Sequence, residues 1–242
     1  MIYNQLFFEY EQILLGNMDS FSSGHFKDKN KIEAQKAALM VCSFAFENYL
    51  HLSPYETKSV LNKALIEKLK LDLVLPYIQF PVEFDKDTDF YYILSLLYPE
   101  QIKISENERV LHYYSRILEK NERFANGYFV GEQGRRRACI CLRYAISKET
   151  KFNSISDLYL LFSENRRVGG SGKKFLKEYR LDHCCYDLYE SKIDYLHDAL
   201  PASQKNTFLY YYYRYRGAKI KISDLLKPLG EPYIVDKIPV IK

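Results

Sequence analysis

The feature that most constrains the fold of this chain is an internal similarity between residues 5–104 and residues 108–206. Apolar positions, glycines and helix-start residues recur in the same order, at an offset of 100 to 104 residues. The offset is larger only where the second copy gains about nine residues near 163–171, and it is restored after Leu188. The pairs include Tyr10 with Tyr114, Phe21 with Phe124, Ala38 with Ala138, and Leu71 with Leu181. Self-similarity of this kind predicts two copies of one structural unit.

Each copy is predicted to be helical. Apolar residues recur at helical spacing near 3–15 and 31–51 in the first copy. They recur in the same way near 106–120 and 134–149 in the second copy. Two short helices are expected to follow in each copy, and Pro99 and Pro201 are expected to end the last of them, since proline removes a backbone donor.

Helix-start signals support these boundaries. Ser53-Pro54-Tyr55-Glu56 has the pattern of a capping box, with proline at the first helical position, where its missing N–H costs nothing. Ser154 and Asp157 repeat this pattern in the second copy, and Ser105 and Glu108 form a similar box before the helix near 106–120. The fold class that follows is mainly α, because these starts alternate with helical apolar patterns and strand patterns are scarce.

The predicted architecture is two pseudo-repeated helical bundles with a short extended C-terminal tail. The first repeat unit is expected at 1–105 and the second, basic one at 106–206. Residues 207–242 are expected to form a C-terminal helix and the extended tail Pro232–Lys242. The 23 Tyr and 15 Phe, with no Trp, are expected to build the two cores.

The composition excludes several classes of protein. Apolar residues make up 47% and charged residues 27% of the chain, as in a globular protein with a packed core. No stretch of 18 residues is free of charge, so no membrane span is expected, and the N-terminus lacks the basic and small-residue pattern of a signal peptide. Five cysteines without a C-x-x-C pair predict reduced, buried thiols in a cytoplasmic protein, with no metal site and no cofactor.

Positive charge is concentrated in the second copy. Residues 135–180 hold 12 Lys or Arg and 4 Asp or Glu, an excess of 12 − 4 = +8. The formal net charge of the chain is +4, so the remainder carries 4 − 8 = −4. A polyanion is therefore expected to approach the second copy.

The strongest binding candidate is the segment 127–143, where a glycine-containing turn leads into a helix. Arg135, Arg136 and Arg137 are expected in the first turn of that helix, with Arg143 two turns later. Cations at a helix N-terminus oppose the helix dipole, which suggests a functional cause such as contact with nucleic-acid phosphates. The alternative is a solvated basic helix face.

The insertion in the second copy is the next candidate. It contains Arg166, Arg167, Lys173 and Lys174 around a Gly-Gly-Ser-Gly stretch. It does not match the phosphate-binding loop G-x-x-x-x-G-K-[ST], since Lys174 stands at the Ser/Thr position. A basic loop could follow a nucleic-acid backbone, or it could be an ordinary solubilising connection. The aromatic and arginine run 210–216 could stack on single-stranded bases, although burial of its rings is the favoured interpretation.

The sequence holds no recognisable set of catalytic residues. His197, between Asp194 and Asp198, has no nucleophile assigned to it and is expected to be structural. No zinc-protease, nucleophile-elbow or dinucleotide motif occurs. The chain is therefore expected not to be an enzyme.

The run Leu52-Ser53-Pro54-Tyr55-Glu56, followed by Leu69-Lys70-Leu71, resembles a helical repeat of uncharacterised proteins. These are tandem helical-repeat proteins of spore-forming Gram-positive bacteria and their mobile elements. The turns Gly24-His25-Phe26 and Gly127-Tyr128-Phe129 fit the same pattern, whereas Leu52 and Phe152 replace its tryptophan. The resemblance implies an α-helical tandem repeat and carries no catalytic residues.

Taken together, the sequence predicts a non-enzymatic, regulatory nucleic-acid-binding protein whose partner is DNA or RNA. The alternative is a protein–protein interaction module of a mobile-element, phage or defence system. That module would use its helical groove or its C-terminal tail, with a protein partner or a second copy of the chain.

Overall fold

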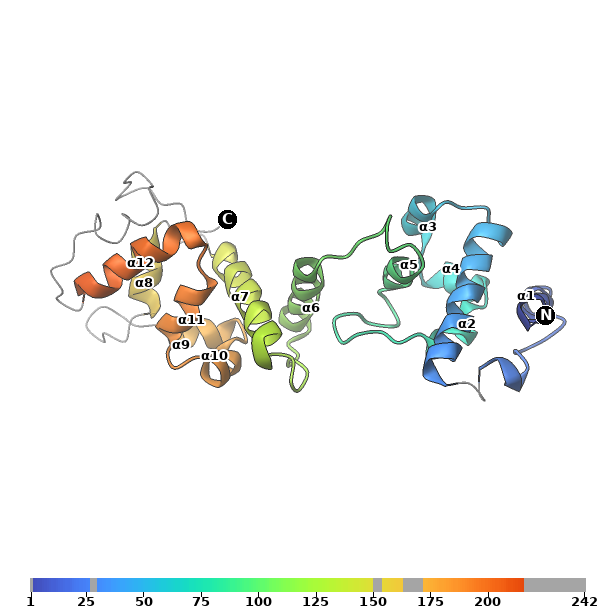
Figure 1. Cartoon of the computed structure of the whole chain (residues 1–242), viewed down its shortest axis with the longest axis horizontal. Coiled ribbons are helices and arrows are strands. Elements are labelled where there is room, and N and C mark those ends of the chain that lie inside the picture. Colours follow the sequence, from blue (N-terminus) through green and yellow to red (C-terminus); the bar gives the residue numbers. More distant parts are fainter. Residues whose placement is uncertain (1, 27–29, 150–153, 163–171, 216–242) are drawn as a thin grey trace. The chain divides into compact units, whose positions relative to one another are not determined.

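The computed structural model describes residues 2–26, 30–149, 154–162 and 172–215 (Figure 1). Within these ranges the chain is helical and holds no strand, so the predicted mainly α fold is confirmed. The predicted extended tail Pro232–Lys242 lies outside the described residues. None of the described helices combines the length and the apolar character that crossing a membrane requires.

The chain divides into two compact units, Met1–Arg109 and Val110–Lys242. Their boundary lies within helix α6 (Glu106–Lys120), a few residues beyond the predicted division between 105 and 106. The last described helix, α12 (Ala202–Tyr215), packs against α8 (Ile155–Phe162) inside the second unit.

The described residues of the first unit form five α-helices and intervening turns ahead of α6. They are α1 (Ile2–Leu14), a 3-10 turn (Ser23–His25), α2 (Lys31–Ser43) with a π-helical continuation (Phe44–Tyr49), α3 (Pro54–Val60), α4 (Lys63–Lys68), two 3-10 turns (Leu71–Leu73 and Leu75–Tyr77) and α5 (Tyr91–Leu97).

The second unit follows a similar order with longer elements. After α6 come α7 (Gly131–Lys148), α8, α9 (Gly172–Glu178), α10 (Asp182–Leu188), α11 (Lys192–Ala199) and α12. Helix α7 begins at Gly131, so the predicted start near 134 is wrong by three residues. Arg135, Arg136 and Arg137 therefore lie in its second turn, where the unfavourable effect of the helix dipole on a cation has already declined.

The capping boxes form in both units. The Ser53 backbone N–H donates to the Glu56 carboxylate at 2.8 Å, and the Glu56 N–H donates to the Ser53 hydroxyl at 3.4 Å. In the second unit the Ser154 N–H donates to the Asp157 carboxylate at 2.9 Å, and the Asp157 N–H donates to the Ser154 hydroxyl at 3.3 Å. Each box satisfies backbone donors that a helix start leaves free.

A buried tyrosine makes the same hydrogen bond in each unit. The Tyr10 hydroxyl donates to the Leu69 carbonyl at 2.7 Å, and the Tyr114 hydroxyl donates to the Tyr179 carbonyl at 2.7 Å. The acceptors lie two residues before the aligned pair Leu71 and Leu181. Immediately after each acceptor the backbone is left-handed, with φ of 53° at Lys70 and 58° at Arg180.

The rings around these tyrosines also correspond. Tyr10 stacks on Phe21 and meets Phe44 edge-on, with centroid distances of 6.2 Å in both contacts. Tyr114 stacks on Phe124 at 5.7 Å and meets Tyr144 edge-on at 5.6 Å. These recurring contacts support an internal duplication, which itself stays a prediction.

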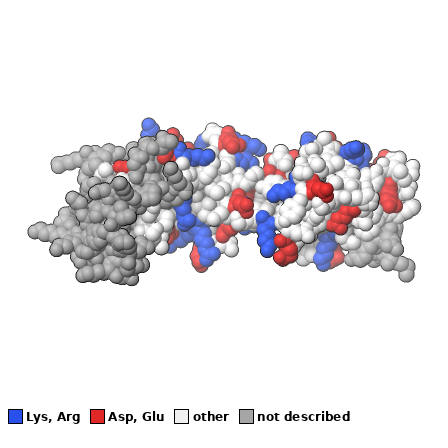
Figure 2. Space-filling view, turned by 90° about the horizontal axis from the view of Figure 1, so that it is seen from above, with Lys and Arg blue, Asp and Glu red and all other residues white. Residues whose placement is uncertain are grey.

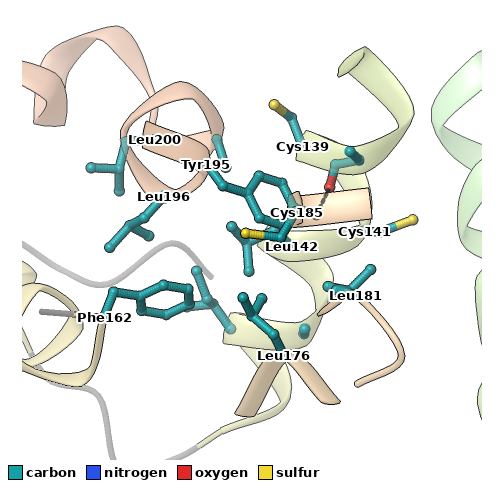
Figure 3. Packing of buried hydrophobic residues seen from close by; sticks show 14 of the residues in the cluster. Cys139, Cys141, Leu142, Phe162, Leu176, Leu181, Cys185, Tyr195, Leu196 and Leu200 are labelled. Carbon is teal, nitrogen blue, oxygen red and sulfur yellow. Dashed lines mark hydrogen bonds between the residues drawn. The ribbon is translucent and has the colours of Figure 1, made fainter. Parts of the chain in front are cut away.

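Each unit has its own hydrophobic core. In the second unit Tyr195 reaches from α11 towards α7 (Figure 3), where its hydroxyl donates to the Ala138 carbonyl at 2.7 Å. The five cysteines are free and buried. Burial raises the pKa of Cys42 to about 12 and that of Cys184 to about 12, so these thiols stay protonated at neutral pH.

Candidate functional site

Two of the predicted binding arginines hold the ends of neighbouring helices. Arg135 donates from Nη2 to the carbonyl of Leu188, the last residue of α10, at 3.0 Å. Arg143 donates from Nε to the carbonyl of Ala199, the last residue of α11, at 2.7 Å. Carbonyls at a helix C-terminus lack partners within the helix and carry partial negative charge, so a guanidinium stabilises them.

The other two arginines of α7 also have partners within the unit. Arg137 donates to the Tyr128 carbonyl at 3.0 Å and lies over the Tyr128 ring, with its guanidinium carbon 4.6 Å from the centroid. Arg136 forms an ion pair with Glu132, one turn earlier in the helix. The fold itself thus supplies a reason for arginine at these positions. Contact with phosphates stays a prediction for Arg135, Arg136 and Arg143, whose side chains are exposed.

Arg135 also belongs to a small polar cluster. Its guanidinium lies 5.1 Å from the centroid of the Tyr189 ring, and the Tyr189 hydroxyl donates to Asp198 at 2.8 Å. Partial burial raises the pKa of Asp198. The hydrogen bonds from Tyr189 and Cys139, with the charges of Lys205 and Arg135, outweigh this effect and lower the pKa below its usual value. Asp198 therefore stays ionised and stabilises the α7–α11 contact.

The lysines of the predicted basic loop lie on α9. Lys173, Lys174 and Lys177 are exposed, whereas Phe175 and Leu176 are buried on the opposite side of the helix. Arg166 and Arg167 lie outside the described residues. On the face shown in Figure 2, the basic and acidic side chains of the described residues are interspersed.

A pocket of about 680 Å³ lies next to α9 in the second unit. One wall is the turn 122–131, which leads from α6 to α7, and the other is formed by residues between Lys177 and Leu188. Its cationic lining comprises Arg123, Lys177 and Arg180, its acidic lining comprises Glu122, Asp182 and Asp187, and His183 also lines it. Among the described residues, Arg123, Lys177 and Arg180 form no ion pair.

The turn that forms one wall is fixed by glycines. Gly127 and Gly131 have φ of 77° and 69°, values that favour glycine. At Gly134 a Cβ atom would lie 2.1 Å from the backbone carbonyl carbon of Phe129, so only glycine permits this close approach of α7 to the turn. The pocket wall is therefore held by the backbone as well as by the packing of Phe124, Tyr128 and Phe129.

These features fall within a span that matches a known family model. Residues 110–205 match the family described as "Protein of unknown function (DUF4046)". No curated protein and no solved structure matches the chain. The DUF4046 span contains α7, α9 and the whole lining of the pocket, so these features lie in the part of the chain that this family model matches.

The DUF4046 span differs from the first unit at the pocket. In the first unit Tyr77 stacks on Phe26, with ring centroids 4.5 Å apart. Continuing the alignment from Leu71 and Leu181 pairs Tyr77 with Asp187, and Phe26 is already paired with Phe129. The second unit thus has a carboxylate where the first has a stacked ring. On the same alignment Lys177 of the pocket replaces Glu67.

Sequence reasoning missed Arg123, His183 and Asp187 as lining residues. The alignment itself could have pointed to Asp187, where a carboxylate replaces the aromatic residue Tyr77 in an otherwise matching segment. No such signal marks Arg123 or His183. The remaining sequence candidates are His197 and the run 210–216, and their described side chains contribute to packing. His197 lies against the buried ring of Phe208, with centroids 5.8 Å apart, and burial lowers its pKa. In the run 210–216 the structure describes one side chain, Tyr211, and it packs on the core.

Proposed function

We propose that the second unit binds nucleic acid through the exposed lysines of α9, without catalysing a reaction. The observation that carries the proposal is the placement of Lys173, Lys174 and Lys177 on one short helix, beside a pocket that adds Arg123 and Arg180. Five cations thus occur together within one unit. Free and buried cysteines suit a reducing compartment, so we place this binding in the cytoplasm.

The physical basis is neutralisation of phosphates. Each lysine that approaches a nucleic-acid backbone releases a condensed counterion, which favours binding at low salt and is independent of base sequence. The α9 lysines suit this role because they form no hydrogen bond or ion pair with any residue that the structure describes. Arg135, Arg137 and Arg143, in contrast, donate to carbonyls of their own unit. The exposed donors of Arg135, Arg136 and Arg143 add a second set of contacts.

The first unit offers a matched control. Helix α4 aligns with α9, and its exposed lysines Lys63 and Lys68 are as numerous as Lys173 and Lys174. The variants Lys173→Ala/Lys174→Ala and Lys63→Ala/Lys68→Ala each remove two charges from corresponding helices. Any difference between them therefore reports location rather than net charge.

The test is fluorescence anisotropy of labelled DNA and RNA oligonucleotides with the full chain, at several salt concentrations. The α9 variant is expected to weaken binding. It is also expected to flatten the plot of log K against log salt by about 0.9 for each lost contact to duplex, or about 0.7 for single strands. The α4 variant is expected to match the parent protein. Equal effects of the two variants, or no salt-dependent binding by the parent, would overturn the proposal.

A further inference from the structure

We infer that the pocket between the turn 122–131 and helix α10 holds a single nucleotide, with its phosphate on the cations and its base against the acidic wall. The inference rests on the proposed function, which is the reason for expecting a nucleotide as the ligand. Two sources share this chemistry: an unpaired or terminal nucleotide of a bound strand, and a free mononucleotide.

The size and lining of the pocket suit such a ligand. Its volume of about 680 Å³ lies within the range of small-molecule sites, about 300–1,000 Å³. The lining combines apolar surface from Phe124 and Phe129 with polar groups from Asn126 and the charged residues. A nucleotide has the same combination, because a flat base and a charged phosphate are joined in one molecule.

The mixture of charges argues for a nucleotide rather than a simple anion. Arg123, Lys177 and Arg180 attract a phosphate, and arginine binds phosphate oxygens through paired N–H donors. Asp182 and Asp187 would repel a bare anion but accept hydrogen bonds from amino groups, as carboxylates do from the cytosine amino group. A ligand that is anionic at one end and a hydrogen-bond donor at the other satisfies both sets of residues.

The position of the pocket also suits a bound strand. Lys177 lies on α9 with Lys173 and Lys174, and at the same time it lines the pocket. A backbone that follows the α9 lysines would therefore reach the pocket without leaving the basic helix. Protein recognition of single strands commonly takes an unstacked base into such a site, with aromatic rings beside it.

The comparison with the first unit supplies the decisive variant. Tyr77 stacks on Phe26 there, and Asp187, which aligns with Tyr77, lines the pocket. Asp187→Tyr is expected to close the pocket in the same way. The matched control is Glu190→Tyr, which makes the same change of charge and a similar change of size at an exposed residue outside the pocket lining.

The experiment is isothermal titration calorimetry of the full chain with each nucleoside 5′-monophosphate and with a short single-stranded oligonucleotide. The parent and Glu190→Tyr are expected to bind at least one monophosphate saturably. Asp187→Tyr is expected to weaken that binding by about tenfold or more, through loss of the phosphate and base contacts. Loss of oligonucleotide affinity in the same variant identifies the strand as the source, and unchanged oligonucleotide affinity identifies a free nucleotide.

A second variant covers the case in which Asp187→Tyr does not fold, as judged by circular dichroism. Lys177→Glu changes an exposed side chain to its first-unit counterpart, and it is expected to weaken monophosphate binding by about tenfold. The inference is overturned if no monophosphate binds, or if both pocket variants bind as tightly as Glu190→Tyr. Failure of the proposed function looks different: Lys173→Ala/Lys174→Ala then leaves oligonucleotide affinity unchanged.

Discussion

The two units show how one helical frame can carry different surfaces. In both units a tyrosine hydroxyl donates to a backbone carbonyl at 2.7 Å, and in both the third helix begins with a capping box. They differ beside that frame, where the first unit has the stacked ring of Tyr77 and the second has Asp187 and a pocket. The comparison teaches that buried contacts can recur in both units while the residues beside them differ.

The loop before the long helix is anchored differently in the two units. In the first unit the buried Glu9 carboxylate accepts a hydrogen bond from the Ser22 backbone N–H at 2.9 Å and lies 3.2 Å from His25. In the second unit the Tyr113 hydroxyl accepts from the Ala125 N–H at 2.9 Å. The aligned residues Glu9 and Tyr113 thus anchor the corresponding loops, through a carboxylate in the first unit and a phenol in the second.

The largest expected effect on stability concerns the close approach of α7, at Gly134, to the Phe129 backbone in the second unit. Gly134→Ala places a methyl group against the Phe129 backbone and is expected to destabilise the second unit by about 3 kcal/mol, as overpacking does. The aligned residue in the first unit is Ala34, which is buried. Ala34→Gly is expected to cost about 1 kcal/mol through helix propensity alone.

Hydrogen exchange measured by mass spectrometry assigns these effects to a unit. Faster exchange confined to α7 and its neighbours is expected for Gly134→Ala, and faster exchange confined to α2 and its neighbours for Ala34→Gly. Unchanged exchange of α7 in Gly134→Ala would show that the turn does not need this close approach.

The next effect tests whether the tyrosine hydrogen bond contributes the same free energy of unfolding in both units. Tyr10→Phe and Tyr114→Phe each remove the hydroxyl donor from a carbonyl, at Leu69 and at Tyr179, and each is expected to cost about 1–2 kcal/mol. Denaturant unfolding of the two variants provides the measurement. A cost in one variant only would break the equivalence of the two frames.

The smallest expected effect is a pH dependence of stability that is confined to the first unit. Burial raises the pKa of Glu9, but the Ser22 hydrogen bonds and the charge of His25 outweigh it, so the pKa is lowered in the folded state. The folded state then binds fewer protons than the unfolded state. The contribution to stability is complete above the unfolded pKa, near 4.5, and is lost as pH falls towards the lower folded value.

Hydrogen exchange at acidic pH is therefore expected to show the turn 22–25 opening before the corresponding turn 125–128, because the second turn is anchored by a phenol and not by a carboxylate. Glu9→Gln serves as the control, since it removes the pH dependence of the first turn while keeping an acceptor. Simultaneous opening of the two turns in the parent protein would contradict this assignment.

Several local features could be predicted from the sequence because they depend on residues close to one another. The capping boxes at Ser53 and Ser154 involve partners three residues apart, and helical spacing of apolar residues is also a short-range pattern. The start of α7 was predicted three residues late. Val130 caps it without a side-chain hydrogen bond, so the helix begins at a glycine without the usual Ser, Thr, Asp or Asn signal.

The sequence by itself therefore determined the helical class, and it predicts a correspondence between the two halves. It undercounted the short helices: two were expected after the long helix of each copy, whereas the described residues form α3, α4 and α5 in the first unit and α8, α9, α10 and α11 in the second. Only the tertiary structure decided what the basic residues do. Arg135 and Arg143 meet carbonyls that are 53 and 56 residues away along the chain, and the pocket joins a turn before α7 to helices after α8. The physical reason is that a charge pattern gives the number of cations in a segment, whereas their free donors depend on which distant carbonyls the packing places beside them.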